Sequence, residues 1–312
     1  MQSKFYVDEI IVTKTILTYL AEWDEDEGPK IIDAHPKPKK LDLEDITMQI
    51  FTSFQTVFGY SDDVSFDRTN LVLPLKSYKT TAKILLDSYR TKKVRGGKLP
   101  FIIAFLVPVQ FIQRELYIYN PIQEKIVDEY SKDKKITLKD YYDEITGKTD
   151  NFAVEVKKEA EALLKSKEYE DSVEKFRSAV FLAKMTKNDD LLDEIMKKFE
   201  PALSKFAKEL LNSASEKAKQ GDYTKAEREH FHTMRLAKES KNDGMIESYT
   251  KKKNDFYGKW IKDLEKQGKS FLKEKNTKEA RAIYDKILKI ANKTKDEKLI
   301  AKYEKEMGKI PE

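Results

Sequence analysis

The pattern of apolar and polar residues divides the chain into two parts. In residues 1–130, β-branched and aromatic residues gather in short runs bounded by turn residues, which is typical of strands. In residues 152–312, long stretches of Lys, Glu, Ala and Leu, all strong helix formers, are interrupted by only two prolines. We therefore predict an α+β protein, in which an antiparallel sheet with flanking helices precedes an all-helical region.

The first part contains seven segments with a strand or helix pattern. A predicted hairpin opens it, because the acidic turn that starts at Asp24 and ends at Gly28-Pro29 separates two β-prone runs. A helix is predicted next, since Ile46, Ile50 and Phe54 recur on one helical face. In chain order, the segments are strands 10–23 and 30–34, helix 43–58, strands 69–75, 81–89 and 99–107, and helix 118–130.

This order of elements resembles the longin fold, within the profilin-like and roadblock-like group. The resemblance is carried by the hairpin Leu17–Ile32, by the amphipathic helix after it, and by a three-strand meander that closes with Arg95-Gly-Gly-Lys-Leu-Pro-Phe-Ile-Ile103. The phrases are similar to those of archaeal longin-domain proteins of the Asgard type. The resemblance implies a non-catalytic module that dimerises, binds small GTPases, or builds vesicle-tethering and adaptor complexes.

The second part repeats itself with a 54-residue period. Thr186-Lys-Asn-Asp recurs at Ser240 and, as Thr-Lys-Asp-Glu, at Thr294, and apolar or small residues match around it in the same register. Asn or Asp in this segment is predicted to cap a helix N-terminus. We predict a solenoid of three stacked units, at about 152–205, 206–259 and 260–312, after a sheet domain at 1–130 and a linker at 131–151.

Each unit also resembles a tetratricopeptide repeat. The clearest match is Ala214 followed by Gly221-Asp-Tyr223-Thr-Lys-Ala226, with small residues at the positions of helix–helix contact. The period of that family is shorter, at roughly 34 residues, so each unit here has an excess of about 20 residues. The excess predicts a third helix in each unit, with the last helix acting as a cap.

Composition excludes several classes of protein. The 312 residues include no cysteine, so disulfides, thiolate catalysis and cysteine metal sites are excluded. Charged residues make up 37% of the chain, against a usual quarter, but the net charge is only +5, divided as −2 over residues 1–130 and +7 over the remainder. No apolar run has the length of a membrane helix or a signal peptide. We expect a soluble cytoplasmic protein.

Motifs for catalysis or cofactor binding are incomplete. Gly147-Lys-Thr149 has the tail of a phosphate-binding loop, but Tyr142 stands where the first glycine would be. His230 and His232 lie on opposite faces of a predicted helix, and His230 is in register with Phe176 and Tyr284, which predicts a packed core residue. His35 is expected in a surface loop, and the acidic turn at 24–27 to be a solvated hairpin tip. We expect no cofactor, no metal and no enzymatic activity.

Two sets of basic residues are candidate interaction sites. One set is in the loop between the last two predicted strands, where it would face an acidic partner, phospholipid or RNA, or be a solvated turn. The other set shares one register on the inner helices and could hold an acidic peptide or a C-terminus. The first set is Arg90, Lys92, Lys93, Arg95 and Lys98, and the second is Lys165, Lys219 and Lys273.

These features predict a non-enzymatic adaptor or scaffold. The longin-like domain would dock a small GTPase or a second longin- or roadblock-type subunit, including a second copy of the chain, in a membrane-trafficking-like or signalling complex. The helical repeats would bind a further protein. The alternative is a nucleic-acid-binding protein that uses the basic helical part, which is disfavoured because its basic residues are interleaved with acids.

Overall fold

The computed structural model describes residues 15–24, 27–38, 41–58, 68–92, 97–111, 113–133 and 135–311. The chain forms two compact units. The first unit comprises residues 1–166 and 174–197, and the second comprises 167–173 and 198–312. The predicted boundary near residue 150 lies inside a continuous helix.

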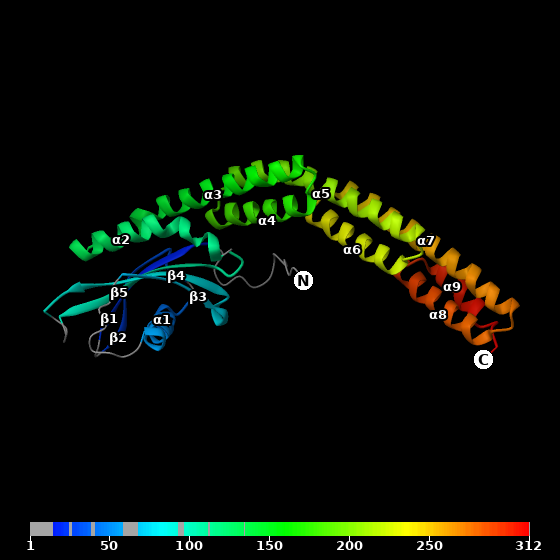
Figure 1. Cartoon of the computed structure of the whole chain (residues 1–312), viewed down its shortest axis with the longest axis horizontal. Coiled ribbons are helices and arrows are strands. Elements are labelled where there is room, and N and C mark those ends of the chain that lie inside the picture. The colour runs from blue at the N-terminus through cyan, green and yellow to red at the C-terminus, as the bar shows by residue number, and fades with distance from the viewer. Residues whose placement is uncertain are drawn as a thin grey trace. The chain divides into compact units, whose positions relative to one another are not determined.

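A five-stranded antiparallel sheet forms the centre of the first unit (Figure 1). Its strands lie in the order β2-β1-β5-β4-β3, so the first and the last strand along the chain pair with each other. The element order predicted from the sequence is confirmed, and residues 10–14 of the first predicted strand lie outside the described residues. The strands are β1 (Leu17–Asp24), β2 (Gly28–His35), β3 (Thr69–Leu75), β4 (Thr80–Arg90) and β5 (Lys98–Pro108).

Helix α1 (Leu43–Phe58) covers one face of the sheet, and helix α2 (Asn120–Asp133), which follows the 3-10 turn η2 (Gln113–Tyr119), covers the other (Figure 1). The apolar side of α1 packs on a core that includes Tyr19 of β1 and Ile84 of β4. Alternate residues of the same strands meet α2, because successive side chains of a strand point to opposite faces. Both faces of the central strands are therefore buried, and β5 reads as a continuous apolar run.

Hydrogen bonds to one carboxylate connect α2 to the sheet. Glu22 Oε1 on β1 accepts hydrogen bonds from the hydroxyl groups of Tyr89 on β4 and Tyr130 on α2, both at 2.6 Å. Burial, reinforced by the bond to Glu22, raises the pKa of both tyrosines above their ordinary value. The three side chains join three elements that are distant in sequence.

The helices of the second half confirm the 54-residue repeat. Helices α4, α6 and α8 begin at residues 169, 223 and 277, and helices α5, α7 and α9 begin at 189, 243 and 297. Both series advance by the period read from the sequence. The helices are α3 (Lys139–Lys165), α4 (Tyr169–Thr186), α5 (Asp189–Lys219), α6 (Tyr223–Glu239), α7 (Asp243–Lys273), α8 (Thr277–Thr294) and α9 (Glu297–Met307).

In the last repeat the predicted third helix is the separate helix α9. In the first two repeats it is continuous with the first helix of the following repeat, so α5 and α7 are each 31 residues long. Neither junction contains a left-handed turn residue, and the helix breakers near them, Pro201 in α5 and Gly258 in α7, are accommodated inside the helices. The predicted linker at 131–151 is also largely helical, since α2 ends at Asp133 and α3 begins at Lys139.

Every turn between α3 and α9 has a residue in the left-handed conformation. The turns that precede α4, α6 and α8 place Lys167, Gly221 and Lys275 at φ of +66°, +81° and +57°. The amide of the next residue then bonds a carbonyl near the end of the preceding helix, as from Asn276 to Phe271 at 2.8 Å, which satisfies that helix end. The turns that precede α5, α7 and α9 repeat the conformation at Lys187, Lys241 and Lys295.

The predicted N-caps are confirmed. They directly follow the turns that precede α5, α7 and α9. Side-chain oxygens of Asn188, Asn242 and Asp296 accept bonds from backbone amides in the first turn of the helix, at 3.0, 3.0 and 3.1 Å. Such bonds satisfy amides that have no partner inside the helix. The repeated four-residue segment thus ends one helix and starts the next.

The repeat also fixes which positions are buried. Small residues occur where one helix closely approaches another: Ala160 and Ala214 are fully buried, and an ideal Cβ at Gly268 would lie 2.7 Å from a ring carbon of Tyr284. Each repeat buries the same further positions, which are Ser172, Phe176, Ala179 and Ala183; Ala226, His230, Thr233 and Ala237; and Ala280, Tyr284, Ile287 and Ala291.

We expect Lys241→Gly to raise the free energy of unfolding by about 0.5–1 kcal/mol. Glycine avoids the ~1–2 kcal/mol cost of a Cβ in the left-handed region, and its greater freedom in the unfolded chain offsets part of that gain. Urea unfolding followed by circular dichroism measures the change. Lys238→Gly, inside α6, is the matched control and should destabilise; stabilisation by both variants, or by neither, would contradict the role of the turn.

We expect Gly268→Ala to lower the free energy of unfolding by about 1–3 kcal/mol, because the added Cβ meets the ring of Tyr284. The preceding repeat has Ala214 and His230 at the corresponding positions, so Tyr284→His should reduce the cost of the alanine. A double-mutant cycle of the two substitutions measures the coupling. Additive effects would show that this contact does not set the helix spacing.

Candidate functional site: two grooves in the helical unit

A basic groove of about 870 Å³ lies in the second compact unit, between α5, α6 and α7. Its floor includes Ala214 and Ala218 of α5 and the ring of Phe256 of α7. Charged residues form its walls, most of them on the exposed side of α7. The lysines are Lys219, Lys252, Lys259, Lys262, Lys266 and Lys269, and the acids are Asp255, Asp263 and Glu265.

Two of these acids are already engaged within the groove. Asp263 accepts a hydrogen bond from the hydroxyl of Tyr223 and pairs with Lys266 at 3.3 Å; the bond from Tyr223 is the main cause that lowers the pKa of Asp263. Glu265 pairs with Lys269 at 2.7 Å and accepts a bond from Tyr303 at 2.7 Å, which together lower the pKa of its carboxyl group to about 2. Both acids therefore stay ionised with their charge partly neutralised.

Aromatic rings line one end of the groove. The ring of Tyr223 stacks on that of Trp260, with ring centroids 5.4 Å apart and planes 4° apart. Phe256 contacts both rings and also His230, whose ring centroid is 4.5 Å away. This packing holds Tyr223 at the start of α6 in a defined position.

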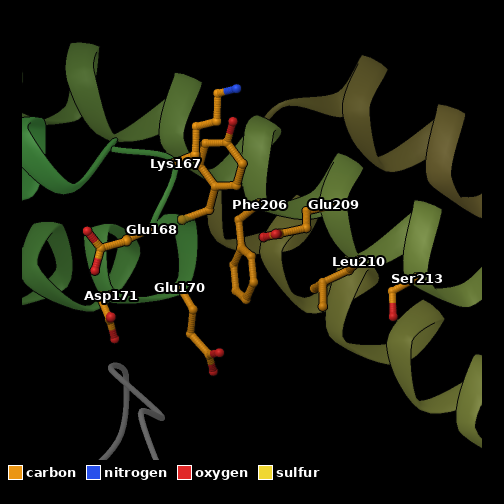
Figure 2. A pocket seen from close by; sticks show the side chains of 9 residues that line it. Lys167, Glu168, Glu170, Asp171, Phe206, Glu209, Leu210 and Ser213 are labelled. Atoms are coloured by element: carbon orange, nitrogen blue, oxygen red, sulfur yellow. The ribbon is translucent and has the colours of Figure 1, made fainter. Parts of the chain in front are cut away.

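An acidic pocket of about 420 Å³ lies one repeat earlier and shares two lining positions with the basic groove (Figure 2). Tyr169 and Glu209 line it, and their counterparts in the next repeat, Tyr223 and Asp263, line the basic groove. Figure 2 shows the ring of Phe206, in register with Trp260, between the side chains of Glu170 and Glu209. The charged residues around it are Lys167, Glu168, Glu170, Asp171 and Glu209. The two sites differ in charge because they use different positions of the repeat: Lys252, Lys259 and Lys262 of the groove match Lys198, Lys205 and Lys208, which do not line the acidic pocket.

The structure places the three register-matched lysines at the same point of the repeat. Lys165, Lys219 and Lys273 are all exposed in the last turns of α3, α5 and α7. Of these, Lys219 lines the basic groove. The sequence reasoning missed the row on α7, although its seven-residue spacing is readable in the sequence.

The basic hairpin loop is only partly described. Arg90 and Lys98 are exposed and face each other at the ends of β4 and β5, and Lys92 is exposed beside them. The turn contains Gly97 at φ +74°, the conformation expected of its glycine pair. Lys93 and Arg95 lie outside the described residues.

The histidines occupy positions unsuited to shared metal binding. His230 is only 7% exposed, as the repeat register predicts, whereas His232 is exposed. His35 is not in a loop: it is the last residue of β2, and its ring meets the edge of Tyr142, with ring centroids 4.6 Å apart. The Gly147-Lys-Thr149 segment lies inside α3. Within the described residues, no group of three or more acidic or histidine side chains could hold a metal ion.

Comparisons with known proteins do not assign a family. No family model and no curated protein matches the chain. One solved structure that matches is a circular tandem repeat protein with "novel repeat topology and enhanced subunit contact surfaces", at 16% identity and a TM-score of 0.17. The match covers 62% of this chain and 42% of that one. In the part of the chain that the structure describes, no helix is long and apolar enough to span a membrane.

We expect His230→Phe to remove part of the acid sensitivity of the fold. Burial, assisted by the positive charge of Lys253 and opposed by Glu229, lowers the pKa of His230 to about 4 from an ordinary value of 6.5. Between these values the unfolded chain binds the extra proton, so the histidine's contribution to stability is present above pH 6.5 and is lost as the pH falls towards 4.

The measurement is urea unfolding at pH 6.5 and pH 4.5. The wild type should lose about 1–2 kcal/mol more than His230→Phe over this interval. His232→Gln changes an exposed histidine and should behave like the wild type. Equal losses in His230→Phe and the wild type would show that His230 is protonated in the folded protein.

Proposed function

We propose that the protein is a non-enzymatic interaction scaffold, whose helical unit binds a segment of another protein. The observation that carries the proposal is the basic groove, an open concave surface built on rigid helices and lined by lysines around an apolar floor. A concave surface that is continuous over repeated helices is how solenoids present a binding face. The fixed Tyr223–Trp260 stack supports a preformed groove.

We propose in addition that the sheet unit is longin-like and docks a small GTPase or a second longin- or roadblock-type subunit, as part of a trafficking-like or signalling complex. The order of elements and the antiparallel sheet with a helix on each face support this. Edge strands are natural places for such docking, because their outer backbone groups can pair with another chain. Here β2 and β3 are the edge strands.

The second candidate is nucleic-acid binding through the same lysines. The observation in its favour is the row of lysines on α7, which could contact phosphates. Against it, the groove has an apolar floor that includes Ala218 and Phe256, which contacts to a phosphate backbone would leave unused. We therefore place protein binding first.

The GTPase proposal is tested with purified full-length protein and small GTPases loaded with GDP or a non-hydrolysable GTP analogue. We expect retention of a GTPase in one nucleotide state, measured by biolayer interferometry, with a groove variant such as Lys252→Glu/Lys259→Glu binding equally well. Light scattering over a concentration series reports self-association. A monomer that retains no GTPase in either state would overturn the docking role of the sheet unit.

A further inference from the structure

The lysines of the basic groove form a row with helical spacing. Lys252, Lys259 and Lys266 are seven residues apart, as are Lys262 and Lys269, and all of them are exposed on α7. Seven residues of α-helix span about 10.5 Å, and the row from 252 to 269 spans about 25 Å. The groove therefore presents positive charge at regular intervals of two helical turns.

Among the described residues on α7 that line the groove, those without an ion pair are Lys252, Lys259 and Lys262 against Asp255, so their summed charge is positive. Lys266 and Lys269 are paired with Asp263 and Glu265 inside the groove. Lys252, by contrast, lies over the ring of Tyr249, with its Nζ 5.4 Å from the ring centroid. Among the residues that the structure describes, no ion pair involves Lys252 or Lys259, so this part of the row can meet acids from a partner.

The spacing distinguishes between partner conformations. A partner helix that lies along α7 repeats its surface every seven residues, so acids in heptad register would meet each lysine in turn. An extended strand advances about 3.4 Å per residue, so about 10.5 Å is three residues and places successive contacts on opposite faces. The small side chains of Ser215 and Ala218 on α5, which are not buried, leave room for a helix backbone to approach.

We propose that the groove takes an acidic amphipathic helix of a partner protein, with carboxylates at seven-residue intervals beside the lysine row and apolar residues on the floor at Phe256. This inference rests on the proposed protein-binding function and specifies its ligand. The lysines favour a partner helix that has an acidic face. The apolar floor favours a helix that also has an apolar face, and therefore an amphipathic one. Single-stranded RNA is the competing ligand.

The test measures binding of fluorescent probes to the full-length protein by anisotropy. The main probe is a capped 21-residue peptide of Glu, Ala and Leu, with Glu in heptad register on one face. A second peptide has two central alanines replaced by proline, which keeps the acids and prevents a continuous helix. The third probe is a 15-nucleotide single-stranded RNA.

The protein variants separate the groove from general charge. Lys252→Glu/Lys259→Glu reverses two lysines seven residues apart in the groove, and Lys298→Glu/Lys305→Glu makes the same change, at the same spacing, on exposed lysines of α9. All four positions are exposed, so circular dichroism should show unchanged folding. We expect the groove variant to bind the helical peptide at least tenfold more weakly, and the α9 variant to bind within twofold of the wild type.

The outcomes separate the inference from the function on which it rests. At least tenfold tighter binding of the helical peptide than of the proline peptide, lost in the groove variant, supports the inference. Equal binding of both peptides, still lost in the groove variant, overturns the helical ligand but supports protein binding. Groove-dependent binding of RNA without binding of either peptide overturns both. Binding of no probe overturns the acidic-helix inference and leaves the GTPase test to decide the function of the sheet unit.

Discussion

The left-handed turn at the end of each helix is the constraint on which the helical half depends. It occurs at the same two places in every repeat, and lysine fills each of these places except that of Gly221. A left-handed lysine is strained, so the turn persists because the hydrogen bonds and the capping residue after it satisfy both helix ends at once. The turn fixes where each helix starts, and so fixes which residues face the core.

Close helix contacts follow from that register. Ala160, Ala214 and Gly268 recur at one position, and the ring at the matching position of the next helix changes from Phe176 to His230 to Tyr284. The absence of a turn inside α5 and α7 makes each a single helix that serves two successive repeats. A long helix with one exposed side can present charged residues at regular intervals, as the lysine row on α7 does.

The repeat keeps charge at some exposed positions and changes it at others. Lys198, Lys205 and Lys208 of α5 match Lys252, Lys259 and Lys262 of α7, whereas Glu170 and Asp171 of the acidic pocket are replaced by Thr224 and Lys225. Positions exposed to solvent tolerate such differences at little cost to stability. A scaffold built in this way could distinguish partners by charge while keeping one fold, and the binding experiments address that property at the groove.

The order of strands and helices in the sheet unit, the 54-residue period, the capping residues and the burial of His230 could all be predicted from the sequence. These features depend on local patterns, namely turn residues, caps and periodic apolar positions, which act over a few residues. The fusion of the predicted third helix into α5 and α7 was missed, because a helix continues wherever nothing stops it and its length is settled by packing. Two features could not be predicted, because they depend on how distant segments pack together: Lys219 of α5 and the lysines of α7 line one groove, and Glu22 joins β1, β4 and α2.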